Sequence, residues 1–230
     1  AVMPSPRGSG GPTAQTLTLQ ASGLLHLSST VWNGQTVDAN LALGSDATAG
    51  FYALRNDSAV QTLTVNGNIT GGSGGTAGNK TLSILGTGSV ALNGNLSKGG
   101  ASVLILTNAL SSGALNLSGS NTVRTLYMTG NANNTVNLTG GETYLSNAGG
   151  VTLYSTQGGV INGPGVIRMS TTSGLEGYNY ADCYCAGGKT LVINAPITGP
   201  GGFELWSGTG TFEFHGINTF EAHVPIGAAG

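Results

Sequence analysis

The sequence predicts an all-β protein, a parallel β-helix (β-solenoid) with no significant helix. Short stretches in which apolar and polar residues alternate recur along the chain, and a period of two is typical of strands. Clusters of Gly, Asn and Ser separate these stretches, as in residues 62–99, and they indicate tight corners. Gly accounts for 41 of the 230 residues, whereas only 7% of residues are charged. Together these features favour a regular stack of short strands.

One unit, a short strand followed by a corner, repeats through most of the chain. Its apolar pairs fall at 63/65, 82/84, 90/92, 104/106, 115/117, 126/128, 136/138, 151/153, 191/193, 203/205 and 212/214. From 104 to 136 the pairs are 10 or 11 residues apart, which predicts about 10 residues per strand and corner and about 20 per turn. Such a unit cannot bury its own apolar side chains, so it has to stack on its neighbours.

Stacking explains the residue types at each position of the unit. Leu, Val and Ile pointing inward form columns through the core, and outward Thr, Ser and Asn can hydrogen-bond along columns of their own. Gly and Asn at the corners accept left-handed dihedrals that bulkier residues avoid. A sandwich or barrel of antiparallel hairpins remains an alternative, because corner residues alone do not exclude it.

The chain divides into a short arm and one long domain. Residues 1–14 are rich in Pro, Gly and Ser, which predicts a flexible arm. Residues 15–230 form the single β-solenoid domain. Residues 173–188 interrupt the strand pattern, and we expect an excursion loop there.

Composition excludes several classes of partner. Seven Lys and Arg in a chain of net charge −2 cannot neutralise a track of phosphates, so nucleic acid is not expected as a partner. No apolar run approaches the ~20 residues that span a bilayer, so we expect no membrane insertion by this chain. No signal peptide is visible. The neutral, hydroxyl-rich composition favours an extracellular location.

The segments 60–99 and 189–227 resemble the autotransporter-associated β-strand repeat of bacterial secreted and surface proteins. Its first half is matched by Ile197, Gly199, Gly201, Gly202 and Phe203. Its second half is matched by Gly208, Gly210, Phe212, Phe214, Gly216, Asn218, Thr219, Phe220, Ile226 and Gly227. Glu221, Ala222 and His223 replace the usual Gly-Gly. The resemblance implies a right-handed parallel β-helix displayed at the bacterial cell surface or released from it.

The two cysteines, Cys183 and Cys185, allow three interpretations. A metal site needs about four ligands and the histidines lie far away in sequence, so no metal is expected. A disulfide is the favoured interpretation, either within the pair, where the separation strains it, or with a neighbouring subunit. Free thiols are the third.

Three tyrosines, Tyr178, Tyr180 and Tyr184, fall in the same segment. Tyrosines in a projecting loop are typical contact residues, so we expect a subunit or ligand contact there, with a plain packed loop as the alternative. The acidic pair Glu204 and Glu213 alternates with inward aromatic residues and should face solvent, with no basic partner nearby. We therefore expect no catalytic residues and no cofactor.

Two function classes follow. The preferred one is a non-enzymatic structural subunit of an extracellular filament or surface assembly, because the ends of a β-solenoid expose unpaired backbone that can template another copy of the chain. The N-terminal arm could lock this joint. The alternative is an adhesin passenger domain that binds glycans or host and cell surfaces. Ice binding by outward Thr-x-Thr pairs is a third possibility, and an enzyme is the last.

Overall fold

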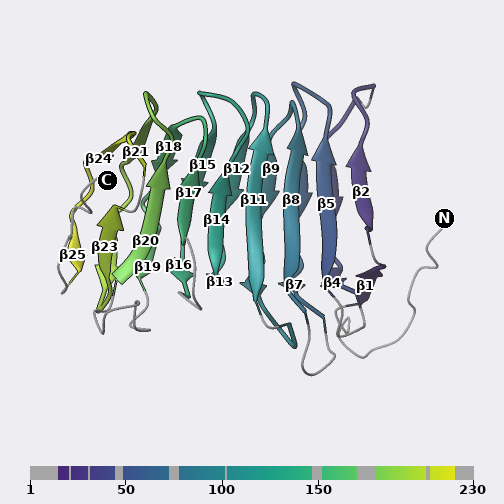
Figure 1. Cartoon of the computed structure of the whole chain (residues 1–230). Coiled ribbons are helices and arrows are strands. Elements are labelled where there is room, and N and C mark those ends of the chain that lie inside the picture. Colours follow the sequence, from purple (N-terminus) through teal and green to yellow (C-terminus); the bar gives the residue numbers. More distant parts are fainter. Residues whose placement is uncertain are drawn as a thin grey trace.

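The chain forms a β-solenoid of about seven turns, built from parallel strands. The computed structural model describes residues 15–20, 22–30, 32–44, 49–72, 78–101, 103–146, 152–169, 180–205 and 208–220. These ranges contain 25 strands and no helix, which confirms the predicted fold class, and none of their segments is a helix able to cross a membrane. The strands succeed one another from β1 at one end of the coil to β25 at the other (Figure 1). The predicted arm, residues 1–14, lies outside the described residues.

Each turn contributes strands to three faces. The front sheet contains β2 (Leu24–Leu27), β5 (Gly50–Asn56), β8 (Lys80–Gly86), β11 (Leu104–Leu110), β14 (Thr125–Met128), β17 (Leu153–Ser155), β20 (Tyr180–Cys185) and β23 (Gly202–Leu205). The back sheet contains β3 (Gln35–Val37), β6 (Leu63–Val65), β9 (Val90–Leu92), β12 (Ala114–Leu117), β15 (Thr135–Leu138), β18 (Gly159–Asn162), β21 (Thr190–Ile193) and β24 (Thr211–Phe214).

The third, lower face is divided into two sheets. Its first sheet contains β1 (Thr16–Leu19), β4 (Asn40–Leu43), β7 (Ile69–Thr70) and β10 (Leu96–Ser97). Its second sheet contains β13 (Asn121–Val123), β16 (Glu142–Leu145), β19 (Val166–Met169), β22 (Ile197–Gly199) and β25 (Thr219–Phe220). The two sheets meet where the amide N–H of Leu96 donates to Asn121 Oδ1 at 3.1 Å.

The turns are longer than the sequence predicts. Partners in neighbouring turns are 20 residues apart at Leu106 and Leu126 and 32 apart at Gly159 and Leu191. The prediction of about 20 residues per turn was therefore low. The list of apolar pairs contains no strand of the lower face, where the shortest elements, such as Ile69–Thr70, have too few residues to show alternation.

The predicted excursion loop is also corrected in part. Residues 173–179 lie outside the described residues, but Tyr180–Cys185 is strand β20, which pairs in parallel with β17 and β23. The inward positions of β20 are occupied by Cys183 and Cys185, and a buried cysteine behaves as a small apolar residue. The strand escaped notice because Cys was not counted in the apolar alternation.

The core consists of columns of inward side chains. In the front sheet Leu82, Leu106, Leu126 and Leu153 stand in register in successive turns, and all four are buried. In the back sheet Val90, Leu115, Val136, Ile161 and Ile193 form a second column. Truncating one such residue to Ala typically costs about 2–5 kcal/mol, so these columns hold the coil together.

Buried asparagines fasten the corners between the front and back sheets. Asn56 Nδ2 donates to the carbonyl oxygens of Gln61 and Ser89, each at 2.7 Å, and Asn56 Oδ1 accepts from the N–H of Ser58 at 2.9 Å. Gly86 sits in the next turn with φ of 104°, where an added Cβ would collide with the Asn56 carbonyl. Glycine is therefore required at this corner.

An asparagine ladder runs along the outer surface at the end of the back-sheet strands. Asn137 Nδ2 donates to Asn116 Oδ1 at 2.8 Å, Asn162 donates to Asn137 at 3.0 Å, and Asn194 donates to Asn162 at 2.8 Å. His215 Nδ1 lies 3.1 Å from Asn194 Oδ1 at the end of the ladder. Each inner amide thus both donates and accepts, so the ladder links five successive turns without any charge.

The ladder makes a graded prediction about stability. Asn137→Ala removes a side chain that makes two ladder bonds, whereas Asn116→Ala removes one that makes a single ladder bond. We expect a loss of about 1–2 kcal/mol for Asn137→Ala and a smaller loss for Asn116→Ala. Urea denaturation followed by circular dichroism measures both, and equal losses would contradict a ladder that acts through its paired amides.

Candidate functional site

The most distinctive surfaces of the coil are its two ends. Among the described strands, β1, β2 and β3 each lie at the edge of a sheet at one end, and β23, β24 and β25 each lie at the edge at the other. An edge strand presents backbone N–H and C=O groups with no strand beyond it, which is a template for pairing with another strand. Within the described residues, both ends therefore have an edge strand on each of the three faces.

The N-terminal end exposes leucines. Leu17 on β1 is paired with the fully buried Leu41 of β4, yet Leu17 itself is 44% exposed because no described strand covers it. Leu24 on β2 is 53% exposed, but it pairs with Ala53 in an outward column and so lies on the side of the coil. At this end the apolar interior is therefore accessible at Leu17.

The C-terminal end carries a cluster of phenylalanines. Phe203 of β23 is fully buried, and its ring centroid lies 6.3, 5.1 and 6.2 Å from the centroids of the only partly buried Phe212, Phe214 and Phe220. These rings come from all three faces, so the cluster closes the interior of the last turn with aromatic surface that remains partly accessible.

The two cysteines lie inside the coil. Cys183 and Cys185 occupy inward positions two residues apart on β20, and both are buried. No disulfide joins them, although a disulfide was the interpretation that the sequence favoured. Neighbouring inward positions of one strand place Cα atoms about 6.6 Å apart with side chains side by side, which suits a disulfide poorly. Burial is the main cause that raises the pKa of both thiols.

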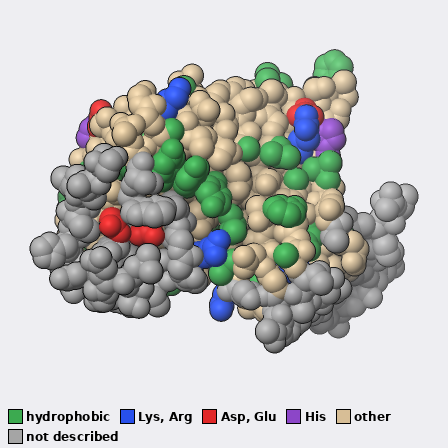
Figure 2. Space-filling model, in the orientation of Figure 1, with side chains coloured by type: hydrophobic (Ala, Val, Ile, Leu, Met, Phe, Trp, Pro, Cys, Tyr) green, Lys and Arg blue, Asp and Glu red, His purple; other side chains and the backbone are tan. Residues whose placement is uncertain are grey.

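Of the three predicted contact tyrosines, only Tyr184 has a described side chain. Tyr178 lies outside the described residues, and for Tyr180 only the backbone is described, in β20. The ring of Tyr184 stacks on Tyr154 with centroids 4.5 Å apart, and Tyr154 contacts Tyr127 edge-on at 5.1 Å. These outward tyrosines form a column over the front sheet, where Figure 2 shows hydrophobic side chains gathered on a mostly uncharged surface. One face of the Tyr184 ring is occupied by Tyr154, and a subunit or ligand contact at Tyr184 stays a prediction.

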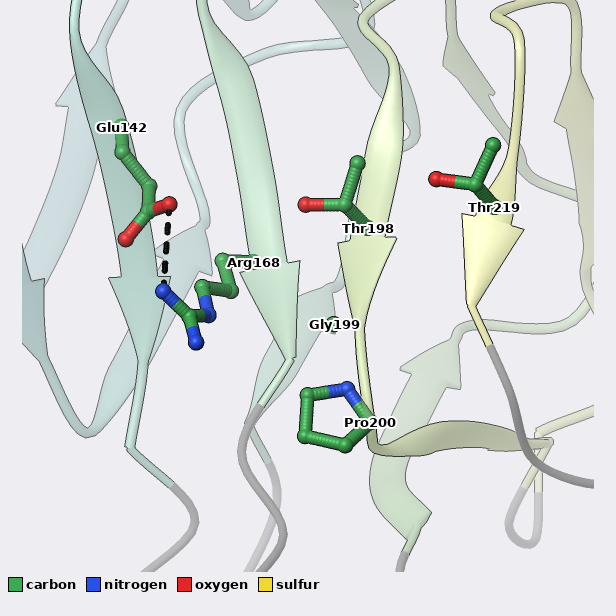
Figure 3. A pocket seen from close by; sticks show the side chains of 6 residues that line it. All are labelled: Glu142, Arg168, Thr198, Gly199, Pro200 and Thr219. Atoms are coloured by element: carbon green, nitrogen blue, oxygen red, sulfur yellow. Dashed lines mark ion pairs between the residues drawn. The ribbon is translucent and has the colours of Figure 1, made fainter.

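A shallow groove on the lower face escaped sequence analysis. It encloses about 290 Å³ and is lined by Glu142, Arg168, Thr198, Gly199, Pro200 and Thr219 (Figure 3). Arg168 Nη1 lies 3.6 Å from Glu142 Oε2, and the guanidinium lies over the ring of Tyr144 at 6.0 Å. Thr198 stands in register with both Arg168 and Thr219, and the two threonine hydroxyls point toward the Arg168 side. No sequence motif marks this groove, because stacking of separate turns creates it.

Outside the groove, Arg55 and His26 both contact the carboxylate of Asp57. Arg55 Nε donates to Asp57 at 2.8 Å, and His26 Nε2 lies 2.9 Å from the same carboxylate. The Arg55 hydrogen bond is the main cause that holds the pKa of Asp57 below its usual value. In the described part of the chain no group of three His, Cys, Asp or Glu side chains could hold a metal ion.

A scan against protein-family models, a search of curated proteins and a search of solved structures each found no match. The assignment of function therefore rests on the ends, the groove and the surface of this chain.

The buried thiols give a direct test of the interior of β20. We expect neither Cys183 nor Cys185 to react quickly with a thiol reagent in the native protein near pH 8, because both are buried and burial raises their pKa. Both should react at once in guanidinium chloride. Thiol counting by absorbance measures this, and a chain with no titratable thiol after denaturation would restore the disulfide interpretation.

Proposed function

We propose that this protein is a non-enzymatic structural subunit of an extracellular bacterial filament or surface assembly, polymerising by end-to-end stacking of β-solenoid subunits. The observation that carries the proposal is the pair of ends, each of which has, among the described strands, an edge strand on all three faces. A second copy of the chain is the partner that supplies parallel strands of matching spacing to all three edges at once. The resemblance of segments 60–99 and 189–227 to a repeat of bacterial surface proteins supports an extracellular location.

The two ends differ, and this favours a filament over a closed dimer. One end exposes Leu17 from the interior and the other presents a phenylalanine cluster, so a contact between unlike ends buries apolar surface on both partners. Such a contact is heterologous and repeats without closing, which generates an open chain of subunits. The N-terminal arm, residues 1–14, remains a candidate for locking the joint.

Polymerisation makes a prediction for the purified chain. We expect it to form filaments at near-neutral pH, seen by electron microscopy, and species larger than a monomer in analytical ultracentrifugation. Raising the salt to about 1 M should not dissolve them, since screening weakens charge contacts and the ends are apolar. A monodisperse monomer at every protein concentration would overturn the proposal.

The groove on the lower face favours a second candidate function, an adhesin that binds glycans. A guanidinium, a carboxylate and two hydroxyls on an open surface provide donors and acceptors for sugar hydroxyls, and Pro200 adds an apolar wall.

A glycan array tests this alternative. An adhesin of this kind should bind defined glycans, and Arg168→Ala should weaken binding by about tenfold or more by removing a charged hydrogen-bond donor. Arg55→Ala is the matched control, because Arg55 is similarly exposed and also paired with a carboxylate, but lies on the front face. Equal effects of the two substitutions, or no bound glycan, would count against the groove.

A further inference from the structure

The lower face carries columns that continue from one end of the coil to the other. Its outward column reads, in register within each of the two sheets, Thr18, Ala42, Thr70 and Ser97, and then Thr122, Tyr144, Arg168, Thr198 and Thr219. The adjacent inward column begins with Leu19 and Leu43 and ends with Gly199 and Phe220. The first and last strands thus present the same kinds of residue at the same positions.

The two terminal strands also leave complementary surface uncovered. Leu17 and Leu19 of β1 point into the coil, and Leu17 is 44% exposed at its end. At the other end Phe220 of β25 points into the coil and is only partly buried against Phe203. If β1 lay beyond β25, Leu19 would cover Phe220, as Leu43 covers Leu19 within one copy.

An internal junction shows that the coil can continue past an asparagine in this face. Asn218 Oδ1 accepts from the amide N–H of Ile197 at 3.2 Å, just as Asn121 Oδ1 accepts from that of Leu96 at 3.1 Å. Beyond Asn121 the stack goes on, because β13 pairs with β16 and Asn121 stands opposite Thr143. By the same pattern Leu17 of a second copy can follow Asn218.

We propose that the joint continues the coil, with β25 of one copy pairing in parallel with β1 of the next, Thr219 opposite Thr18 and Phe220 opposite Leu19. This inference rests on the proposed end-to-end assembly and adds the register of its joint. The partner is a second copy of this chain, and the joint is a backbone ladder with Leu-on-Phe contact inside it. The outward threonines stand side by side on the surface.

A cysteine pair tests the register. Neighbouring strands lie about 4.8 Å apart. In the proposed register the Cα atoms of Thr18→Cys in one copy and Thr219→Cys in the next are therefore close enough for a disulfide. Within one copy nine strands of the lower face run from Thr18 to Thr219, so the two positions are eight strand spacings, or roughly 38 Å, apart and cannot bridge internally. Mild oxidation of the assembled double variant should therefore give a ladder of covalent multimers on a non-reducing gel.

The matched control is Thr16→Cys with Thr219→Cys. Thr16 lies on the same strand and the same face as Thr18, but two positions away, so its distance to position 219 in the proposed register is the diagonal one of about 7–8 Å. We expect at least about tenfold less multimer from this control, because that distance exceeds the range of a disulfide. Equal ladders from both double variants, or none from the first, would overturn the register.

A second measurement does not depend on oxidation. Leu17→Asp puts a charge at the interior of the joint, and we expect it to raise the protein concentration needed for assembly by about tenfold or more. Val60→Asp adds the same charge at an 84% exposed position on the side of the coil and should change it little. Circular dichroism verifies that both variants stay folded.

The outcomes separate the joint from the proposed function. One outcome is that filaments form, that both cysteine pairs crosslink equally, and that Leu17→Asp does not change assembly. This outcome would refute the proposed joint but would agree with a structural subunit. A chain that stays monomeric refutes both.

Discussion

Every feature of this protein depends on the backbone hydrogen bonds that join each strand to the strand one turn away. Because the pairing is parallel and in register, a side chain at one position stands about 4.8 Å from its counterpart in the next turn. Alternation along a strand then becomes two sets of columns, one inside and one outside. The inner columns exclude water with Leu, Val and Ile, and the outer columns must be filled by side chains that tolerate close copies of one another.

This stacking explains the scarcity of charge. Like charges directly opposite each other on neighbouring strands are destabilising, and a charged column would repeat that repulsion at every turn. Asparagine avoids it, since each amide can donate to one neighbour and accept from the other, as Asn137 does between Asn116 and Asn162. Arg55 is paired with Asp57 and Arg168 with Glu142. Asp182 and Glu204, which stand opposite each other on β20 and β23, are the exception among the described strands. The neutral composition is thus a consequence of the fold and carries no information about a ligand by itself.

The sequence predicts the fold through local alternation, and it fails where alternation is too short or the residue types are unusual. Strands such as Leu104–Leu110 are plain in the sequence, whereas Leu96–Ser97 is not, so most strands of the lower face and the true turn length were missed. Cys183 and Cys185 looked like a disulfide candidate in a loop because their inward direction depends on pairing with β17. The groove was invisible for the same reason. Glu142, Arg168 and Thr198 come from three turns, and only the register brings them together.

The same register determines how strong a joint between copies can be. A single short edge such as Thr219–Phe220 contributes few hydrogen bonds, and isolated pairs of short strands are only marginally stable in water. Three edges on one rigid coil change this, because pairing on one face holds the other two faces in place at high effective concentration. The ends therefore act as units whose faces reinforce one another. A defect in the apolar interior weakens all three ladders at once, while a substitution on the outer side of one face leaves the other two to hold the joint.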